Sequence, residues 1–103
     1  MANPLQPKVI KCLENDFDAY VINLTSASKA GNMDVLACIK GEFFGFEVKW
    51  KSDQPSLLQK QKINACINAG GKAFFTRSIA ELRDQIAGTI KPVKYELGNK
   101  FTL

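Results

Sequence analysis

The residues best suited to chemistry in this sequence are two carboxylates and a lysine: Asp34, Glu47 and Lys49. If they come together, the two carboxylates repel one another unless a cation lies between them. Carboxylate oxygens are hard ligands that suit Mg²⁺ or Mn²⁺, and Mg²⁺ often takes only one or two of them from the protein. A lysine beside such a site can orient or help deprotonate an attacking water and offset charge on a phosphate. The trio therefore indicates metal-dependent hydrolysis of a phosphate ester.

A predicted β-hairpin brings these three side chains to one place. Apolar residues alternate over 35–39 and over 44–50, and Lys40-Gly41 between them forms the turn. With the turn centred on the Lys40–Gly41 bond, facing residues have numbers that sum to 81, so Asp34 lies opposite Glu47. Lys49 shares the face of Glu47, because side chains alternate along a strand. The opposite face of the second strand is predicted to be the core face: Phe44, Phe46, Val48 and Trp50.

Two alternatives stay open at this point. The two acids and the lysine can be solvated charges on the polar face of a hairpin, joined by a surface salt bridge. A turn centre shifted by half a residue would also place Asp34 opposite Val48 instead of Glu47.

Composition narrows the class of protein. With 103 residues and 46% hydrophobic content, residues 1–103 are expected to form a single small domain. A net charge of +4 favours a polyanionic partner. Three widely spaced cysteines argue against a disulfide framework or a zinc cluster, which indicates a reducing, cytoplasmic setting. No signal-peptide pattern or long apolar run is present, so neither secretion nor membrane spanning is expected.

The sequence contains no histidine. This excludes Ser-His-Asp and Cys-His nucleophilic schemes, histidine-ligated zinc and histidine-based nucleases. No phosphate-binding loop with its Lys-Ser/Thr is visible either. The remaining hydrolytic mechanisms depend on carboxylates.

A helix is predicted from about 56 to 69. Its inward stripe runs from Ile63 to Ile67, and Gln59 lies on the same side one turn earlier, whereas Gln61 points nearly the other way. Gln59 is therefore placed to hold a catalytic side chain or a water. The alternative is that its amide satisfies backbone groups at the helix start.

These residues resemble the VRR-NUC branch of the PD-(D/E)XK nuclease superfamily, in particular its small stand-alone members from phages and bacteria. The resemblance implies that Asp34, Glu47 and the backbone carbonyl of Val48 bind Mg²⁺ or Mn²⁺, that Lys49 serves the water, and that Gln59 supports the site. The likeness rests on the following pattern, in this order: Gly31-x-x-Asp34, the hairpin, Glu47-x-Lys49, Ser56-x-x-Gln59 and a helix that closes on Gly70-Gly71.

The first helix, predicted around 7–14, departs from that family. Family members usually carry a glutamate early in this helix, facing the metal, where this chain has Gln6. Gln6 can point inward as a neutral ligand. Glu14, near the end of the helix, is more simply a solvated acid.

The predicted fold is α/β, a restriction-endonuclease-like sandwich with a central mixed β-sheet flanked by helices. A strand over 20–24 precedes the hairpin, and a strand over 72–76 and a helix over 78–88 follow the helix at 56–69. Residues 89–103 are expected to form a basic tail or an edge strand. Hydroxyl and basic side chains near the site are candidates for DNA contact: Ser28, Lys29, Lys51, Lys60, Lys62 and Arg77.

We therefore expect a Mg²⁺- or Mn²⁺-dependent DNA endonuclease. The family likeness implies a homodimer that cuts branched DNA in the manner of a Holliday-junction resolvase. Tyr95, Leu97 or Phe101 would extend the dimer interface. The alternatives are a nickase or flap nuclease, or a basic nucleic-acid-binding module without catalysis.

Overall fold

The computed structural model describes residues 3–24 and 33–97. Their helices and strands form an α/β arrangement, which confirms the predicted fold class. The elements follow in the order α1 (Leu5–Asp16), β1 (Tyr20–Asn23), β2 (Val35–Ile39), β3 (Glu42–Val48), α2 (Leu57–Asn68), β4 (Lys72–Thr76) and α3 (Ile79–Ala87).

The strands form one sheet in the order β1-β2-β3-β4. β1 and β2 pair antiparallel, as do β2 and β3, whereas β3 and β4 pair parallel. A parallel pair needs a crossover connection, which α2 supplies. The sheet is therefore mixed, as predicted.

The β2–β3 hairpin has the predicted register. Val35 pairs with Phe46 and Ile39 with Glu42, so paired residue numbers sum to 81. Lys40 and Gly41 have φ values of 49° and 83°, and two consecutive positive φ values are typical of a two-residue type I′ turn. The half-residue shift is thereby excluded.

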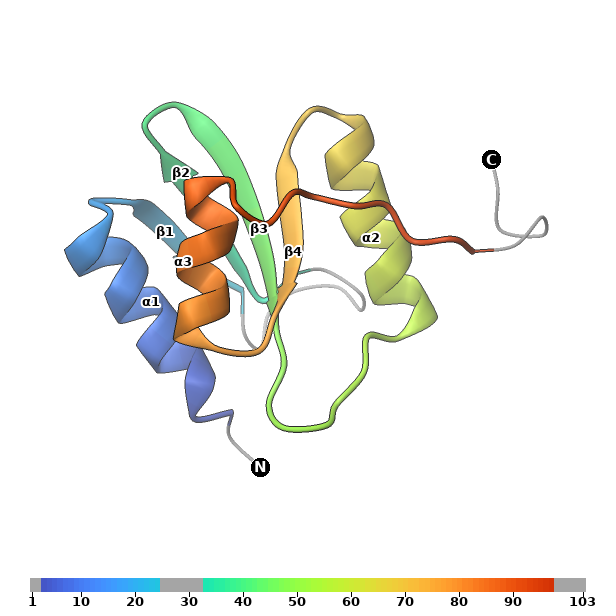
Figure 1. The fold of residues 1–103 in the computed structure, drawn as a ribbon, viewed down its shortest axis with the longest axis horizontal. Helices are drawn as coiled ribbons and strands as arrows, with labels where there is room; N and C mark the ends of the chain where they lie inside the picture. Colours follow the sequence, from blue (N-terminus) through green and yellow to red (C-terminus); the bar gives the residue numbers. More distant parts are fainter. Residues whose placement is uncertain (1–2, 25–32, 98–103) are drawn as a thin grey trace.

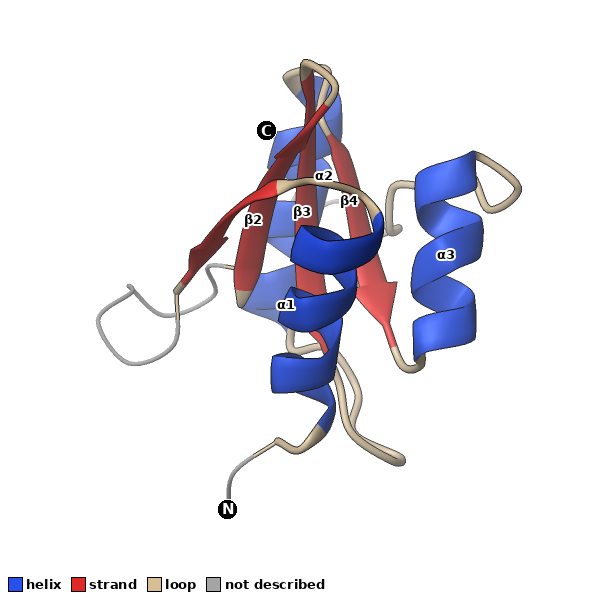
Figure 2. Cartoon of the chain, turned by 90° about the vertical axis from the view of Figure 1, so that its left-hand side faces the viewer, coloured by secondary structure: helices blue, strands red, loops and turns tan. Residues whose placement is uncertain are grey.

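Helices cover both faces of the sheet. α1 and α3 pack against one face and against each other, whereas α2 packs against β3 and β4 on the other face (Figures 1 and 2). The larger apolar cluster lies between the sheet and the α1–α3 layer. Its burial is the main source of folding free energy and holds β3 in place. The cluster includes Val9, Leu13, Val35, Phe44, Phe46, Phe74 and Leu82.

Residues 44–48 of β3 are buried on both faces, contrary to the expectation that Glu47 lies on a polar face. The reason is its position: β3 lies between β2 and β4, and α2 packs over the face that carries Glu47. Trp50 is 36% exposed beyond the end of β3, so its predicted place in the core is wrong. The other predicted core residues of this strand are buried: Phe44, Phe46 and Val48.

Residues 91–97 run alongside α2 without forming a strand (Figure 1). The amide side chain of Asn64 replaces the backbone pairing of an edge strand: its Nδ2 donates to the Tyr95 carbonyl at 2.9 Å, and its Oδ1 accepts from the Tyr95 N–H at 2.8 Å. Over the described part of the tail, the predicted edge strand is therefore wrong. In 3–24 and 33–97, no helix is long and apolar enough to span a membrane.

Candidate active site

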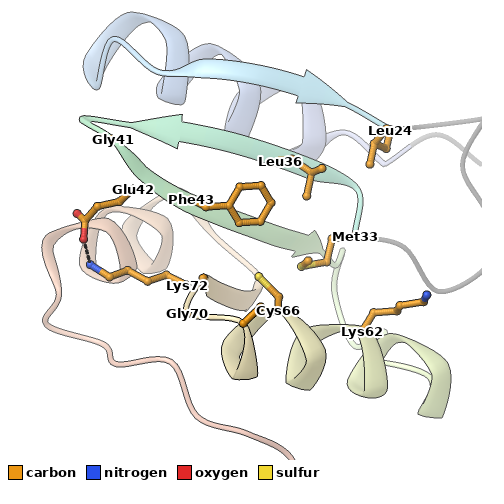
Figure 3. A pocket seen from close by; sticks show the side chains of 12 residues that line it. Leu24, Met33, Leu36, Gly41, Glu42, Phe43, Lys62, Cys66, Gly70 and Lys72 are labelled. Atoms are coloured by element: carbon orange, nitrogen blue, oxygen red, sulfur yellow. Dashed lines mark hydrogen bonds and ion pairs between the residues drawn. The ribbon is translucent and has the colours of Figure 1, made fainter.

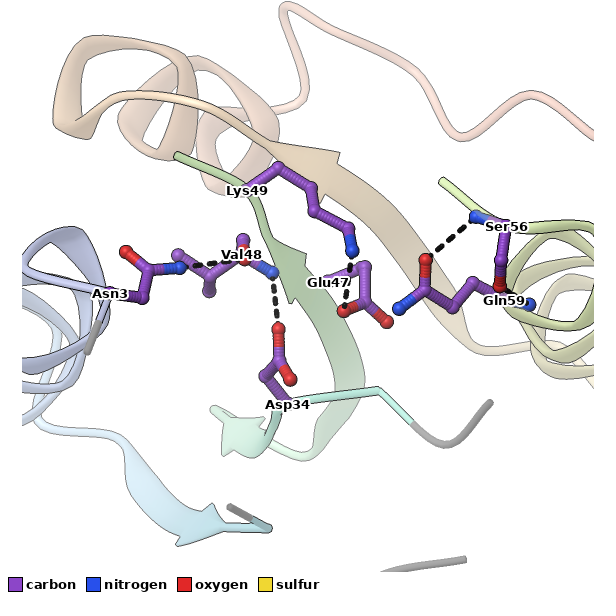
Figure 4. A network of polar contacts seen from close by, with 7 residues as sticks. All are labelled: Asn3, Asp34, Glu47, Val48, Lys49, Ser56 and Gln59. Atoms are coloured by element: carbon purple, nitrogen blue, oxygen red, sulfur yellow. Dashed lines mark hydrogen bonds and ion pairs between the residues drawn. The ribbon is translucent and has the colours of Figure 1, made fainter. Parts of the chain in front are cut away.

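Asp34 lies directly before β2, where the hairpin register continues toward Glu47. Its Oδ2 accepts a hydrogen bond of 2.9 Å from the Val48 N–H, and its own carbonyl accepts one of 2.8 Å from the Leu24 N–H (Figure 4). Both sides of the residue are thus bound to backbone groups. This arrangement orients the carboxylate toward the end of β3.

Glu47 is the most unusual ionisable residue in the described chain. Its side chain is 1% exposed, and its Oε2 has no hydrogen-bond partner among the described residues. Burial is the largest cause that raises the pKa of Glu47, to about 9; the neighbouring Asp34 carboxylate adds to the rise and Lys49 opposes it. Without a cation, Glu47 therefore holds a proton at neutral pH. A solvated surface carboxylate would have neither property, so the surface-charge alternative is wrong for Glu47.

Lys49 follows β3 and remains held to β4, because its N–H donates to the Thr76 carbonyl at 2.9 Å. Its Nζ lies 3.9 Å from Glu47 Oε1, and its side chain is 17% exposed. The ammonium group thus stands at the rim, with the buried carboxylate on one side (Figure 4). The three residues predicted from the sequence come together.

The sequence interpretation missed Asn3. Its Nδ2 donates a hydrogen bond of 2.9 Å to the Val48 carbonyl, the backbone group that the resemblance assigns to the metal (Figure 4). Its Oδ1 accepts from the Leu5 N–H at 2.9 Å and so ties the start of α1 to this contact. No local signal points to Asn3, since it lies 45 residues away from Val48 in the sequence.

Gln59 forms a capping box with Ser56 at the start of α2. Its Oε1 accepts from the Ser56 N–H at 2.8 Å, and its N–H donates to Ser56 Oγ at 3.1 Å. The capping alternative is therefore observed. With its oxygen bound in this way, the amide nitrogen is turned toward Glu47 (Figure 4). The two ends of the Gln59 amide thus point to different neighbours: the oxygen to the helix cap and the nitrogen to Glu47.

We expect Gln59→Ala to lower the cleavage rate more than Gln61→Ala does. Only Gln59 faces the buried carboxylate, and its loss removes a donor that is already held by the helix cap. Ser56→Ala is the matched control, because it removes the cap at a cost of about 1 kcal/mol but retains the amide. Single-turnover rates at matched folded fraction measure the difference. Equal rates for the Gln59 and Gln61 variants would contradict the expectation.

Gln6 does not point into the carboxylate pair. Its Nε2 donates a hydrogen bond of 2.9 Å to Asn23 Oδ1 at the end of β1. Glu14 is exposed on α1, as expected of a solvated acid. In the described ranges, no group of three or more His, Cys, Asp or Glu side chains could hold a metal. The site consists of two carboxylates and a backbone carbonyl.

This donor set fits a hard divalent cation. A buried acceptor without a partner costs about 1–3 kcal/mol of folding free energy. Coordination of a cation by Glu47 Oε2 would remove this cost. Mg²⁺ commonly binds one or two protein carboxylates and leaves its other positions to water or phosphate. Asp34, Glu47 and the Val48 carbonyl are oxygen donors that meet this need.

The predicted DNA-contact residues have different surroundings. Lys51 and Lys62 are exposed, whereas the Lys60 Nζ lies 5.6 Å from the centroid of the Tyr95 ring. Arg77 is largely engaged within the protein: its Nη1 donates to the Lys51 carbonyl at 2.7 Å and its guanidinium lies 4.5 Å from the Phe75 ring. Ser28 and Lys29 lie outside the described residues. Arg77 is thus placed to brace the turn after Lys49.

Comparison with known proteins bears on the fold. A solved structure of a VRR_NUC domain superposes with a TM-score of 0.66, at 20% sequence identity, and the match covers 82% of this chain and 92% of that one. No protein-family profile matches the sequence. No curated protein matches it either. The fold is therefore that of a VRR_NUC domain, as the sequence resemblance implied.

Proposed function

We propose that this chain, with the fold of a VRR_NUC domain, is a Mg²⁺- or Mn²⁺-dependent endonuclease that hydrolyses phosphodiester bonds in DNA. The observation that carries the proposal is the buried Glu47, which stands beside Asp34 and whose Oε2 has no hydrogen-bond partner in residues 3–24 and 33–97. Such an arrangement costs stability in the absence of a cation. A functional need for a cation explains why the fold retains it.

Asp34, Glu47 and the Val48 carbonyl would hold the cation. When bound, the cation supplies positive charge that stabilises the phosphate as charge develops on it. Glu47 must lose its proton to take part, and Lys49, 3.9 Å from Glu47 Oε1, favours that loss. Lys49 also stands where its ammonium group can orient the attacking water and offset phosphate charge. The Gln59 amide nitrogen, which is turned toward Glu47 (Figure 4), would support the site from the start of α2.

The preferred substrate that we propose is a four-way DNA junction. A symmetric junction needs two matched cuts, and this domain offers one pair of carboxylates, so two copies are required. A nickase or flap nuclease would use the same site on one strand. A binding module without catalysis would leave the buried Glu47 unexplained.

A cleavage assay with end-labelled DNA tests the proposal. The substrates are a four-way junction, a flap, a nicked duplex and a linear duplex, each with Mg²⁺, Mn²⁺ or EDTA. We expect paired cuts on the junction with either metal and none with EDTA. Binding of all four substrates without cleavage would favour the binding module.

We expect the protein to be a homodimer at micromolar concentration. Two sites related by a two-fold axis would have the fixed separation that paired cuts need. We expect Tyr95 to contribute less to this interface than the sequence suggested, because Asn64 binds both its backbone groups and its side chain is partly buried. Phe101 lies outside the described residues. Sedimentation equilibrium, with and without junction DNA, measures the mass. A monomer in both conditions would rule out this assembly.

A further inference from the structure

Among the described residues, no helix covers the β1–β2 half of the sheet on the α2 side. α2 packs against β3 and β4, whereas β1 and β2 present apolar side chains on that face. The register places Tyr20 opposite Cys38, and Cys38 opposite Phe43, so these side chains share one face. Tyr20 is 71% exposed and Phe43 is 48% exposed. Two aromatic rings are thus exposed on this face, toward the hairpin-turn end of the sheet.

A hollow of about 730 Å³ lies between this face and α2 (Figure 3). Its size is in the range of small-molecule sites, roughly 300–1,000 Å³. A Cβ added at Gly71 would lie 2.6 Å from Cys66 Sγ and 3.1 Å from Phe43 Cδ2, so the absent side chain lets the backbone approach both. The walls are mainly apolar and include Leu24, Met33, Leu36, Phe43 and Cys66.

The hollow lies on the same face as Glu47, with Met33 between them. Phe43, Gly45 and Glu47 alternate along the same face of β3, which places Phe43 about 13 Å along the strand from Glu47. Met33 lies over Gly45 between them, since a Cβ at Gly45 would be 2.4 Å from Met33 Sδ. Met33 lines the hollow, and the next residue is Asp34. The Met33 end of the hollow is therefore the end that DNA held at the carboxylates would reach first.

The charges at the two ends of the hollow differ. Lys72, at the end formed by the hairpin turn, is ion-paired with Glu42 (Figure 3). Lys62 is exposed at the other end, where Leu24 and Met33 lie (Figure 3). Positive charge is thus greatest at the end next to Asp34. A polyanion that approaches the hollow from the side of the carboxylates would contact Lys62 before it reaches the Phe43 ring.

We propose that the hollow receives an unstacked nucleobase of the DNA strand that is cut, with Lys62 at the neighbouring phosphate. The apolar walls and the Phe43 ring match the two faces of a base, and stacking on an aromatic side chain is tolerant of base identity. A linear duplex keeps its bases stacked, so the substrate class is DNA that presents an unstacked nucleotide close to the cut, as at a branch point or an unpaired position. This inference rests on the proposed function and specifies its substrate.

Binding to DNA with 2-aminopurine at an unpaired position tests the inference. The Glu47→Gln protein is used so that the DNA stays intact, and a fully paired duplex of the same sequence is the reference. We expect the parent to bind the unpaired DNA more tightly and to quench the 2-aminopurine fluorescence by stacking. Phe43→Ala should lose about tenfold in affinity for the unpaired DNA and lose the quenching, with duplex affinity unchanged.

Two further variants support the comparison. Lys62→Ala should weaken binding of the unpaired DNA, whereas Lys11→Ala, exposed on α1 across the sheet, should not. Equal losses on paired and unpaired DNA, or unchanged quenching in Phe43→Ala, would overturn the inference. So would a fall in oligomer mass in Phe43→Ala without a change in base preference, since a second copy would then cover this face.

The proposed function and this inference can fail separately. Metal-dependent cleavage with no preference for unpaired nucleotides would overturn the inference alone. Binding and quenching of the unpaired base by the wild-type protein, without cleavage under any metal, would support the hollow as a base site and overturn the nuclease proposal.

Discussion

Glu47→Gln will lower metal-dependent cleavage by at least about a hundredfold. The substitution preserves the shape of a side chain that is 1% exposed but removes the negative charge that a cation needs. Asp34→Asn should have a similar effect, because the amide oxygen of Asn can still accept from the Val48 N–H while the negative charge is lost. Single-turnover cleavage of the best substrate at saturating Mg²⁺ measures both losses.

Glu14→Gln is the matched control for this experiment. Glu14 is exposed on α1, which packs on the other face of the sheet, so its replacement should leave the rate within about twofold of wild type. Lys49→Ala distinguishes cation binding from the orientation of the attacking water. This variant should lose cleavage but still bind the cation. A Glu47→Gln protein that cleaves at near wild-type rate would refute the catalytic assignment.

The metal-free protein should lose stability as the pH rises from about 6 to about 8. The pKa of Glu47 is about 9 in the folded protein, against an ordinary value of 4.5. The folded state therefore binds a proton that the unfolded chain has released, so the stabilisation is fully present below about pH 4.5 and is lost as the pH rises through about 9. One proton over two pH units corresponds to at most about 3 kcal/mol. That is a fall in Tm of several degrees or more.

Thermal denaturation with and without EDTA measures this dependence. Glu47→Gln should remove most of the slope, because the amide does not titrate, and should be the more stable protein at about pH 8. Mg²⁺ should raise the Tm of the wild type more at about pH 8 than at about pH 6, since cation binding displaces the proton. An equal slope in wild type and Glu47→Gln would show that other groups cause it.

The local elements could be predicted from the sequence. The Lys40-Gly41 turn and the alternation on either side of it specify the hairpin register, which brings Asp34 beside Glu47. Ser56 and Ser78 cap α2 and α3, and Gly88 ends α3 with a φ of 88°. Such signals act between residues a few positions apart, so they can be recognised from the sequence without knowledge of the fold.

The burial of Glu47 could not be predicted in this way. Alternating apolar and polar residues predict a strand with one buried face. The second face of β3 is enclosed because α2 packs over β3 and β4. The hydrogen bond from Asn3 to Val48, which is 45 positions away, could not be predicted from the sequence either. Nor could the contact by which Asn64 holds the tail at Tyr95. Hence residue type and spacing were sufficient to place Asp34, Glu47 and Lys49 together as a candidate site. The protonation of Glu47 and its neighbours depend on contacts between elements far apart in the chain, which no short-range preference encodes.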